Sequence, residues 1–65
     1  MGEKLGMIGL GKMGLALSKE FLADGHEMLG YDVDEGRMKM LEGLGGKRAA
    51  SAKEIAEQCD ITFSI

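Results

Sequence analysis

Three glycines spaced as G-x-G-x-x-G lie between a short apolar run and a segment with helical periodicity. The apolar run, residues 4–9, is typical of a strand buried on both faces. Over residues 12–24, apolar side chains recur every four positions, as on one face of a helix. The glycines stand where the strand turns into the helix. This order restricts the chain to folds in which a tight turn made of small residues joins a strand to a helix.

Short strands and helices continue to alternate after this turn. The connections are short, so parallel strands joined by right-handed crossovers are the natural assembly. The sequence therefore predicts an α/β fold, a doubly wound parallel sheet with the order β-α-β-α-β-α-β. The remaining elements are expected as strands over residues 27–32, 47–50 and 60–65 and as helices over 35–43 and 52–58.

Capping residues set the helix boundaries in this prediction. Gly25 can adopt the left-handed conformation that ends the first helix, and Asp34 offers an N-cap oxygen to the second. Ser51 and Glu54 match a capping box, in which each side chain accepts a hydrogen bond from the other residue's backbone N–H. The buried stripes of the first two helices are expected to hold Met13, Leu17 and Phe21, and Met38, Leu41 and Leu44.

Length, charge and cysteine content exclude several classes of protein. The chain has 65 residues, room for one small domain, and we expect no second domain within it. Its net charge is −3 and its basic residues are not clustered, which argues against a nucleic-acid partner. The single cysteine cannot form an internal disulfide, and no Cys/His set has metal-ligand spacing. No apolar stretch approaches the ~20 residues of a membrane helix. We therefore expect a cytoplasmic protein without a membrane partner.

Each glycine of the motif has a physical role at such a turn. Gly9 permits the tight bend, Gly11 lets the backbone approach a pyrophosphate, and Gly14 lets the helix lie close to the sheet. The helix start then presents free N–H groups and the positive end of its dipole to the phosphates. Taken alone, the hexapeptide is a weak signal, because an ordinary tight turn in a glycine-rich chain can have the same sequence pattern.

An acidic residue at the end of the second strand strengthens the signal. Asp32 lies close to the ~20-residue spacing at which a carboxylate accepts hydrogen bonds from the adenosine ribose. A carboxylate there repels a 2′-phosphate, so NAD is favoured over NADP as cofactor. Arg37 could still turn toward a 2′-phosphate, which keeps NADP open as the less favoured alternative. The other interpretation of Asp32 is a solvated carboxylate at a strand end.

The candidate site contains eight residues and no catalytic or metal-binding group. Lys12 fits a solvated helix-start lysine better than a phosphate ligand, and Tyr31 fits strand packing better than adenine stacking. His26 is expected on the surface of a turn, and Cys59 as filler near a helix end. The residues expected to bind the cofactor are Gly9, Leu10, Gly11, Lys12, Met13, Gly14, Tyr31 and Asp32.

Four stretches of the chain together resemble a known family. Residues 7–14, 25–27, 31–32 and 51–60 are similar to the N-terminal segment of the β-hydroxyacid dehydrogenases, which include 3-hydroxyisobutyrate dehydrogenase, tartronate semialdehyde reductase and 6-phosphogluconate dehydrogenase. The last stretch is most similar to the tartronate semialdehyde reductase branch. The resemblance implies that residues 1–65 form the N-terminal half of a Rossmann-like NAD(P)-binding domain. In the full-length enzyme, it implies hydride transfer between nicotinamide and a small 3-hydroxy acid.

The resemblance also implies what this chain lacks. In that family a lysine on a later helix handles the proton, and a later Ser-Gly-Gly segment holds the substrate carboxylate; neither is present here. We therefore expect a fragment that has no activity alone, and open sheet edges that favour self-association. Two alternatives stay open at this point: a nucleotide-sensing regulatory domain without catalysis, and a minimal folding module with little ligand affinity.

Overall fold

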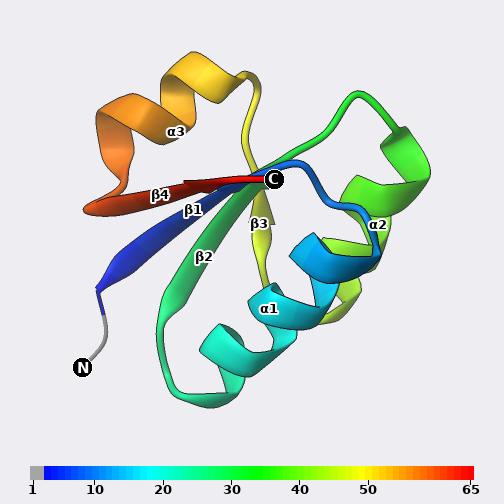
Figure 1. The fold of residues 1–65 in the computed structure, drawn as a ribbon, viewed down its shortest axis with the longest axis horizontal. Coiled ribbons are helices and arrows are strands. Elements are labelled where there is room, and N and C mark those ends of the chain that lie inside the picture. The colour runs from blue at the N-terminus through cyan, green and yellow to red at the C-terminus, as the bar shows by residue number, and fades with distance from the viewer. Residues whose placement is uncertain (1–2) are drawn as a thin grey trace.

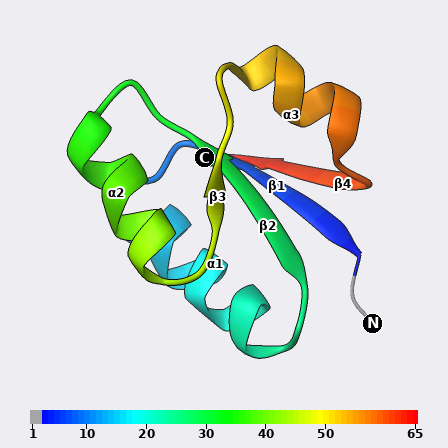
Figure 2. The ribbon, with the colours of Figure 1, turned by 180° about the vertical axis from the view of Figure 1, so that it is seen from behind.

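The computed structural model describes residues 3–65, which form a four-stranded parallel sheet with helices on both faces (Figure 1). Helices α1 and α2 cover one face and α3 covers the other (Figure 2). The predicted doubly wound α/β fold is confirmed. In chain order the elements are β1 (Lys4–Ile8), α1 (Lys12–Ala23), β2 (Glu27–Tyr31), α2 (Glu35–Gly43), β3 (Lys47–Arg48), α3 (Ala52–Gln58) and β4 (Ile61–Ser64).

The strands lie in the order β3-β2-β1-β4, and all neighbours are parallel. Gly6 in the middle of β1 lies beside Leu29 of β2 and Thr62 of β4. The chain first adds strands on one side of β1 and then crosses to the other side. The carboxyl end of β1 is therefore a topological switch point, the place where open α/β sheets bind their ligands.

Two apolar cores flank the sheet, because successive strand residues point to opposite faces. Met28 is buried toward α1 and α2, whereas Leu29 is buried toward α3. Because both faces of the strands are buried, the strand sequences are continuous apolar runs. The first core contains Leu5, Met7, Leu10, Met28 and Leu41, and the second contains Leu29, Ala49 and Ile55.

The buried side of α1 differs in part from the predicted stripe: Leu17 and Phe21 pack against the first core as predicted, but Met13 does not. Met13 is 65% exposed, and the wholly enclosed positions of the helix are Gly14 and Ser18. Small residues face the sheet because α1 approaches it closely, which turns Met13 outward. The Ser18 hydroxyl donates a 2.8 Å hydrogen bond to the Gly14 carbonyl, which satisfies its buried polar group. In α2, Leu41 is buried as predicted, but Leu44 is 39% exposed because it lies beyond the last turn.

The caps follow the prediction with one correction. Gly25 has a φ of +90° after α1, and the Asp34 side chain accepts from the backbone N–H of Gly36 at 2.9 Å. The Ser51 hydroxyl accepts from the Glu54 N–H, as in a capping box. The Glu54 carboxylate, however, accepts from the N–H of Ala50 and not of Ser51. The Glu54 side chain thus extends past the N-cap residue, Ser51, to the residue before it.

Arg48, in the short edge strand β3, forms ion pairs with two residues of α2. Its Nη2 lies 2.6 Å from Glu35 Oε2 and 3.0 Å from Glu42 Oε1, at the two ends of the helix. These contacts raise the pKa of Arg48, and the bond from Arg48 lowers the pKa of Glu35. Residues 47–50 were expected as a strand, but only two of them pair. The ion pairs therefore link both ends of α2 to β3.

Candidate functional site

The glycine turn begins one residue after β1 and is bonded to the neighbouring strand. Gly9 has a backbone φ of +99°, which residues other than glycine rarely adopt. Its N–H donates a 2.9 Å hydrogen bond to the carbonyl of Tyr31, the last residue of β2. The turn is thereby fixed to the strand that precedes the predicted ribose acid.

Gly14 allows α1 to lie directly against this turn. A Cβ atom at position 14 would overlap the carbonyl oxygen of Gly9. That obstacle is backbone, which cannot rotate away as a side chain can. The third glycine of the motif therefore lets α1 lie close to the turn at the end of β1, in agreement with the close approach of helix and sheet that was predicted.

Gly11 is the N-cap of α1, and the space beside it is open. Within residues 3–65, no side chain caps this helix, and no atom lies within 4 Å of where a Cβ of Gly11 would be. By contrast, Asp34 caps α2 and Ser51 caps α3. The first N–H groups of α1 thus have no side-chain acceptor among the described residues, and the open backbone at Gly11 is accessible from outside.

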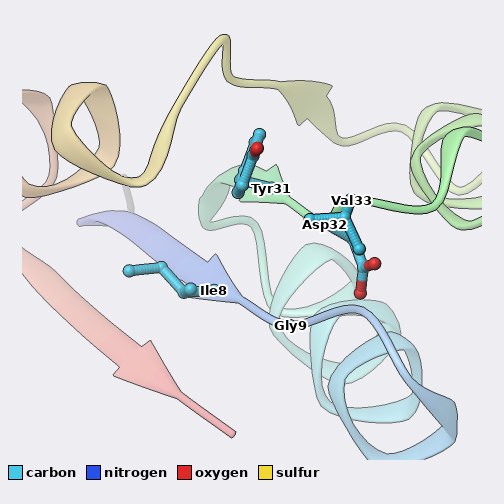
Figure 3. A pocket seen from close by; sticks show the side chains of 5 residues that line it. All are labelled: Ile8, Gly9, Tyr31, Asp32 and Val33. Carbon is cyan, nitrogen blue, oxygen red and sulfur yellow. The ribbon is translucent and has the colours of Figure 1, made fainter.

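Asp32 lies at the glycine turn, one residue after β2. Its Oδ2 accepts a hydrogen bond of 2.7 Å from the N–H of Leu10, and its Oδ1 accepts one of 2.8 Å from the N–H of Asp34. These bonds, the one from Leu10 above all, lower the pKa of the Asp32 carboxyl. The acid is therefore charged at neutral pH. Asp32 therefore lies beside the glycine turn, as the nucleotide prediction requires (Figure 3).

A pocket of about 220 Å³ opens at the ends of β1 and β2. Figure 3 shows the Tyr31 side chain pointing away from the Asp32 carboxylate, whose oxygens point toward the turn. The pocket thus has mainly apolar walls, which suit the ring of a base, and the Asp32 carboxylate lies on the side toward the turn. Its lining residues are Ile8, Gly9, Tyr31, Asp32 and Val33.

The remaining predicted site residues take different positions. The Leu10 side chain is wholly buried in the first core, so only its backbone can face a ligand. Lys12 and Met13 are exposed at the start of α1 and do not line the pocket. Tyr31 is half-buried against the second core and also lines the pocket. Its expected packing role and a ligand contact are therefore compatible.

Two residues that line the pocket, Ile8 and Val33, are not among the predicted site residues. Ile8 was expected only as part of the buried strand over residues 4–9, and no role was predicted for Val33. Val33 is 91% exposed. An apolar side chain directly after a strand-end acid was the available sequence signal for this part of the pocket wall.

Two lesser candidates lie away from this site. His26 precedes β2, at the amino end of the sheet, and is half-buried with its ring edge-on to Phe21 at 6.0 Å. It was expected on the surface, but packing against Phe21 encloses its Nδ1. Cys59 is half-buried after α3, as expected, and burial raises the pKa of its thiol.

Residues 3–65 contain no helix long and apolar enough to cross a bilayer. Among the same residues, no group of three or more His, Cys, Asp or Glu side chains is placed to hold a metal ion.

A glycine turn, an uncapped helix start and a strand-end carboxylate at a topological switch point together define a dinucleotide-binding α/β domain. Residues 4–65 match the family model described as the NAD binding domain of 6-phosphogluconate dehydrogenase, and the chain belongs to this family. The predicted family and the predicted cofactor, NAD, are confirmed.

Individual relatives agree with this assignment. A probable 3-hydroxyisobutyrate dehydrogenase-like protein of Arabidopsis thaliana is 39% identical over 62 residues, covering 95% of this chain and 21% of its own. The structure of 3-hydroxyisobutyrate dehydrogenase from Mycobacterium tuberculosis superposes with a TM-score of 0.94 at 25% identity, over 100% of this chain and 22% of that one. An imine reductase variant from Myxococcus stipitatus, solved with NAD+, has a TM-score of 0.92 at 31% identity, over 98% and 22%. The chain thus spans about a fifth of the length of these proteins.

Proposed function

We propose that this chain is the N-terminal, cofactor-holding part of an oxidoreductase that transfers a hydride between nicotinamide and a small 3-hydroxy acid. The observation that carries the proposal is the hydrogen bond between the Asp32 carboxylate and the Leu10 N–H, which joins the two halves of the motif. Bound nicotinamide would supply the hydride chemistry, while the residues of this chain hold the adenosine diphosphate end of the cofactor.

The pyrophosphate is assigned to the start of α1. The backbone at Gly11 is open, and the N–H groups of the first helical turn have no capping side chain among the described residues. Helix N-termini with this character attract phosphate through both hydrogen bonds and the helix dipole. Lys12, exposed beside this position, adds one positive charge.

The adenosine is assigned to the pocket at the ends of β1 and β2. Asp32 would accept hydrogen bonds from the ribose hydroxyls, since each of its oxygens holds one backbone N–H and has capacity for another. Tyr31, Ile8 and Val33 supply apolar surface for the base. The charged state of Asp32 disfavours a 2′-phosphate and so favours NAD.

The whole protein's substrate, activity and assembly are inferred from the family. Relatives named as 3-hydroxyisobutyrate dehydrogenases support a small 3-hydroxy acid as substrate, and the family match supports an enzyme over a nucleotide sensor. We further propose that these 65 residues are inactive alone and self-associate through the free edge of β4. The cytoplasmic location stays a prediction.

Isothermal titration of NAD into the protein tests the cofactor assignment, with Gly11→Ala as the decisive variant. Gly11 has an extended backbone and open space beside it, so alanine should leave folding intact while its methyl group occupies the phosphate approach. We expect NAD affinity to fall about tenfold or more, the scale of losing a charge-assisted hydrogen bond. Gly43→Ala, at an equally open glycine in α2, is the matched control and should bind NAD as the parent does.

Equal affinity of the parent and Gly11→Ala would contradict the pyrophosphate assignment. The proposed inactivity is tested separately by incubating the protein with NAD and small 3-hydroxy acids and following reduced nicotinamide. Turnover by these 65 residues would overturn that part of the proposal.

A further inference from the structure

Met13 places an exposed thioether in the first turn of α1, beside the assigned pyrophosphate site. It is the second residue after the N-cap, and its side chain is 65% exposed. Met7 and Met28 are buried in the first core, and Met38 packs against that core. Met40, in α2, is 60% exposed and does not line the pocket. Within residues 3–65, an oxidant in solution therefore reaches the thioethers of Met13 and Met40 first.

The start of α1 offers backbone donors to any acceptor on the Met13 side chain. The first hydrogen bond of the helix runs from the Leu15 N–H to the Gly11 carbonyl at 2.9 Å. The N–H groups of residues 12–14 precede this bond, and N–H groups at this end of a helix have no partner within the helix. Among the described residues, no side chain caps α1, and its first turn holds no acidic residue. The thioether of Met13 is a weak acceptor and does not compensate for this.

A side-chain oxygen of the required reach already bonds a helix start elsewhere in this molecule. Glu54, in the first turn of α3, accepts a hydrogen bond of 2.6 Å from the N–H of Ala50 with its Oε1. The oxygen of methionine sulfoxide stands as many bonds from Cα as a glutamate Oε does, and it is a polar acceptor. Oxidation of Met13 would therefore put an acceptor within range of the first-turn N–H groups of α1.

We propose that Met13 is an oxidative modification site that controls cofactor binding: its sulfoxide oxygen accepts from the first-turn N–H groups of α1 and so competes with the pyrophosphate. The oxidant is hydrogen peroxide. The sulfur lone pair attacks one peroxide oxygen, the S–O bond forms as the O–O bond breaks, and the proton of the transferred oxygen passes to the departing hydroxide, which leaves as water. The sulfur is oxidised and the peroxide is reduced, and enzymatic reduction of the sulfoxide reverses the change. The inference rests on the proposed function, because it takes the pyrophosphate to lie at the start of α1.

Peroxide treatment of the parent, Met13→Leu and Met40→Leu isolates the effect of Met13. Each protein is treated until peptide mapping by mass spectrometry shows its exposed methionines oxidised, and calorimetry gives the dissociation constant of NAD before and after. We expect oxidation to weaken NAD binding about tenfold in the parent and in Met40→Leu, the scale of a lost charge-assisted hydrogen bond. Met13→Leu should keep the affinity of its own untreated form, because its other oxidisable side chains, Cys59 included, are those of the parent. Methionine sulfoxide reductase should restore the affinity of the oxidised parent, and a loss that it does not reverse would contradict the proposal.

Met13→Gln tests the competing acceptor without an oxidant. Glutamine is neutral, and its amide oxygen stands at the same number of bonds from Cα as the sulfoxide oxygen. We expect Met13→Gln to bind NAD about fivefold more weakly than Met13→Leu and to melt a few degrees higher, because the acceptor partly caps α1. Met40→Gln and Met40→Leu are the matched pair in the interior of α2, where the backbone N–H groups are bonded within the helix, and should agree in both measurements.

Three further results would overturn the proposal while leaving the proposed function standing. They are an oxidised parent that binds NAD as the untreated protein does, a Met13→Leu variant that loses as much affinity on oxidation as the parent, and a Met13→Gln variant that binds NAD as tightly as Met13→Leu or melts no higher. An untreated parent that does not bind NAD overturns the proposed function, and the control by Met13 with it. Circular dichroism detects any loss of fold on oxidation, in which case the comparison of Met13→Gln with Met13→Leu decides.

Discussion

The carboxylate of Asp32 accepts a hydrogen bond of 2.7 Å from the backbone N–H of Leu10, so the acid that ends one strand also fixes the turn that ends its neighbour. The residue proposed to recognise the ribose is thus part of the structure that presents the pyrophosphate site. A substitution at Asp32 should change both the choice of cofactor and the geometry of the turn. Selectivity and turn stability are coupled through this one side chain.

This coupling predicts a pH-dependent effect of Asp32→Asn on stability. Hydrogen bonds from Leu10 and Asp34 lower the pKa of Asp32 in the folded state below its ordinary value of 3.8. A lowered folded-state pKa gives stabilisation that is fully present above the ordinary value and is lost as the pH falls through the lowered one. We expect Asp32→Asn to reduce the free energy of unfolding by about 1 kcal/mol at pH 7, as for one hydrogen bond, and by less at pH 2.5.

Urea unfolding of the parent and the variant at both pH values measures this difference. Glu57→Gln, at an exposed carboxylate of α3, is the control and should have little effect at either pH. A difference between the parent and Asp32→Asn that is the same at pH 7 and pH 2.5 would show that the carboxylate does not stabilise the turn.

Gly14→Ala should destabilise the fold more than any comparable glycine substitution in a helix. The added methyl group would overlap the Gly9 carbonyl, so α1 must move away from the turn. Crowding of this kind costs about 2 kcal/mol or more, a large share of the stability of so small a domain. Gly43→Ala meets no neighbouring atom and should be neutral or stabilising by up to about 1 kcal/mol. Thermal unfolding compares the two, and equal melting temperatures would contradict the close approach of α1.

The order of elements and the meeting of Asp32 with the turn could be predicted from the sequence, whereas the strands expected over residues 47–50 and 60–65 are shorter in the structure. Each depends on local signals, such as a buried apolar run, a glycine with a positive φ or an N-cap aspartate. Asp34 caps α2 as its position indicated, and α2 covers the predicted residues. In a parallel sheet, two elements that end adjacent strands must come together, so the proximity of Asp32 to Gly9 follows from topology alone.

The predictions that failed depend on tertiary packing. A four-residue repeat put Met13 in the core, but the tight contact at Gly14 rotates small residues toward the sheet instead. His26 is half enclosed because Phe21 happens to lie beside it. The approach of Arg37 to the Leu10 carbonyl joins residues distant in sequence, and no local pattern indicates it.

The free edge of β4 should mediate self-association. Among the described strands, β4 pairs only with β1, and Ile61 of this strand is 42% exposed. The opposite edge, β3, is short and carries Lys47 and Arg48, which discourage pairing with another chain. Thr62→Lys places a charge on the unprotected edge and should weaken dimerisation about tenfold, as measured by sedimentation equilibrium.

The matched control for this test is Ala16→Lys, on the exposed side of α1. It adds the same charge away from the sheet edge and should associate as the parent does. A parent protein that stays monomeric up to millimolar concentration, or a Thr62→Lys variant that dimerises equally well, would contradict association through β4.

The central claim is that the glycine turn and Asp32 bind one dinucleotide together. The most direct measurement is a titration of the ¹⁵N-labelled protein with NAD, following each backbone amide by NMR. We predict that the amides of Gly11, Met13 and Val33 shift together with a single dissociation constant, while those of His26 and Glu27, at the other end of the sheet, do not move. Shifts that leave Gly11 and Val33 unchanged, or that follow different dissociation constants at the two positions, would contradict the account.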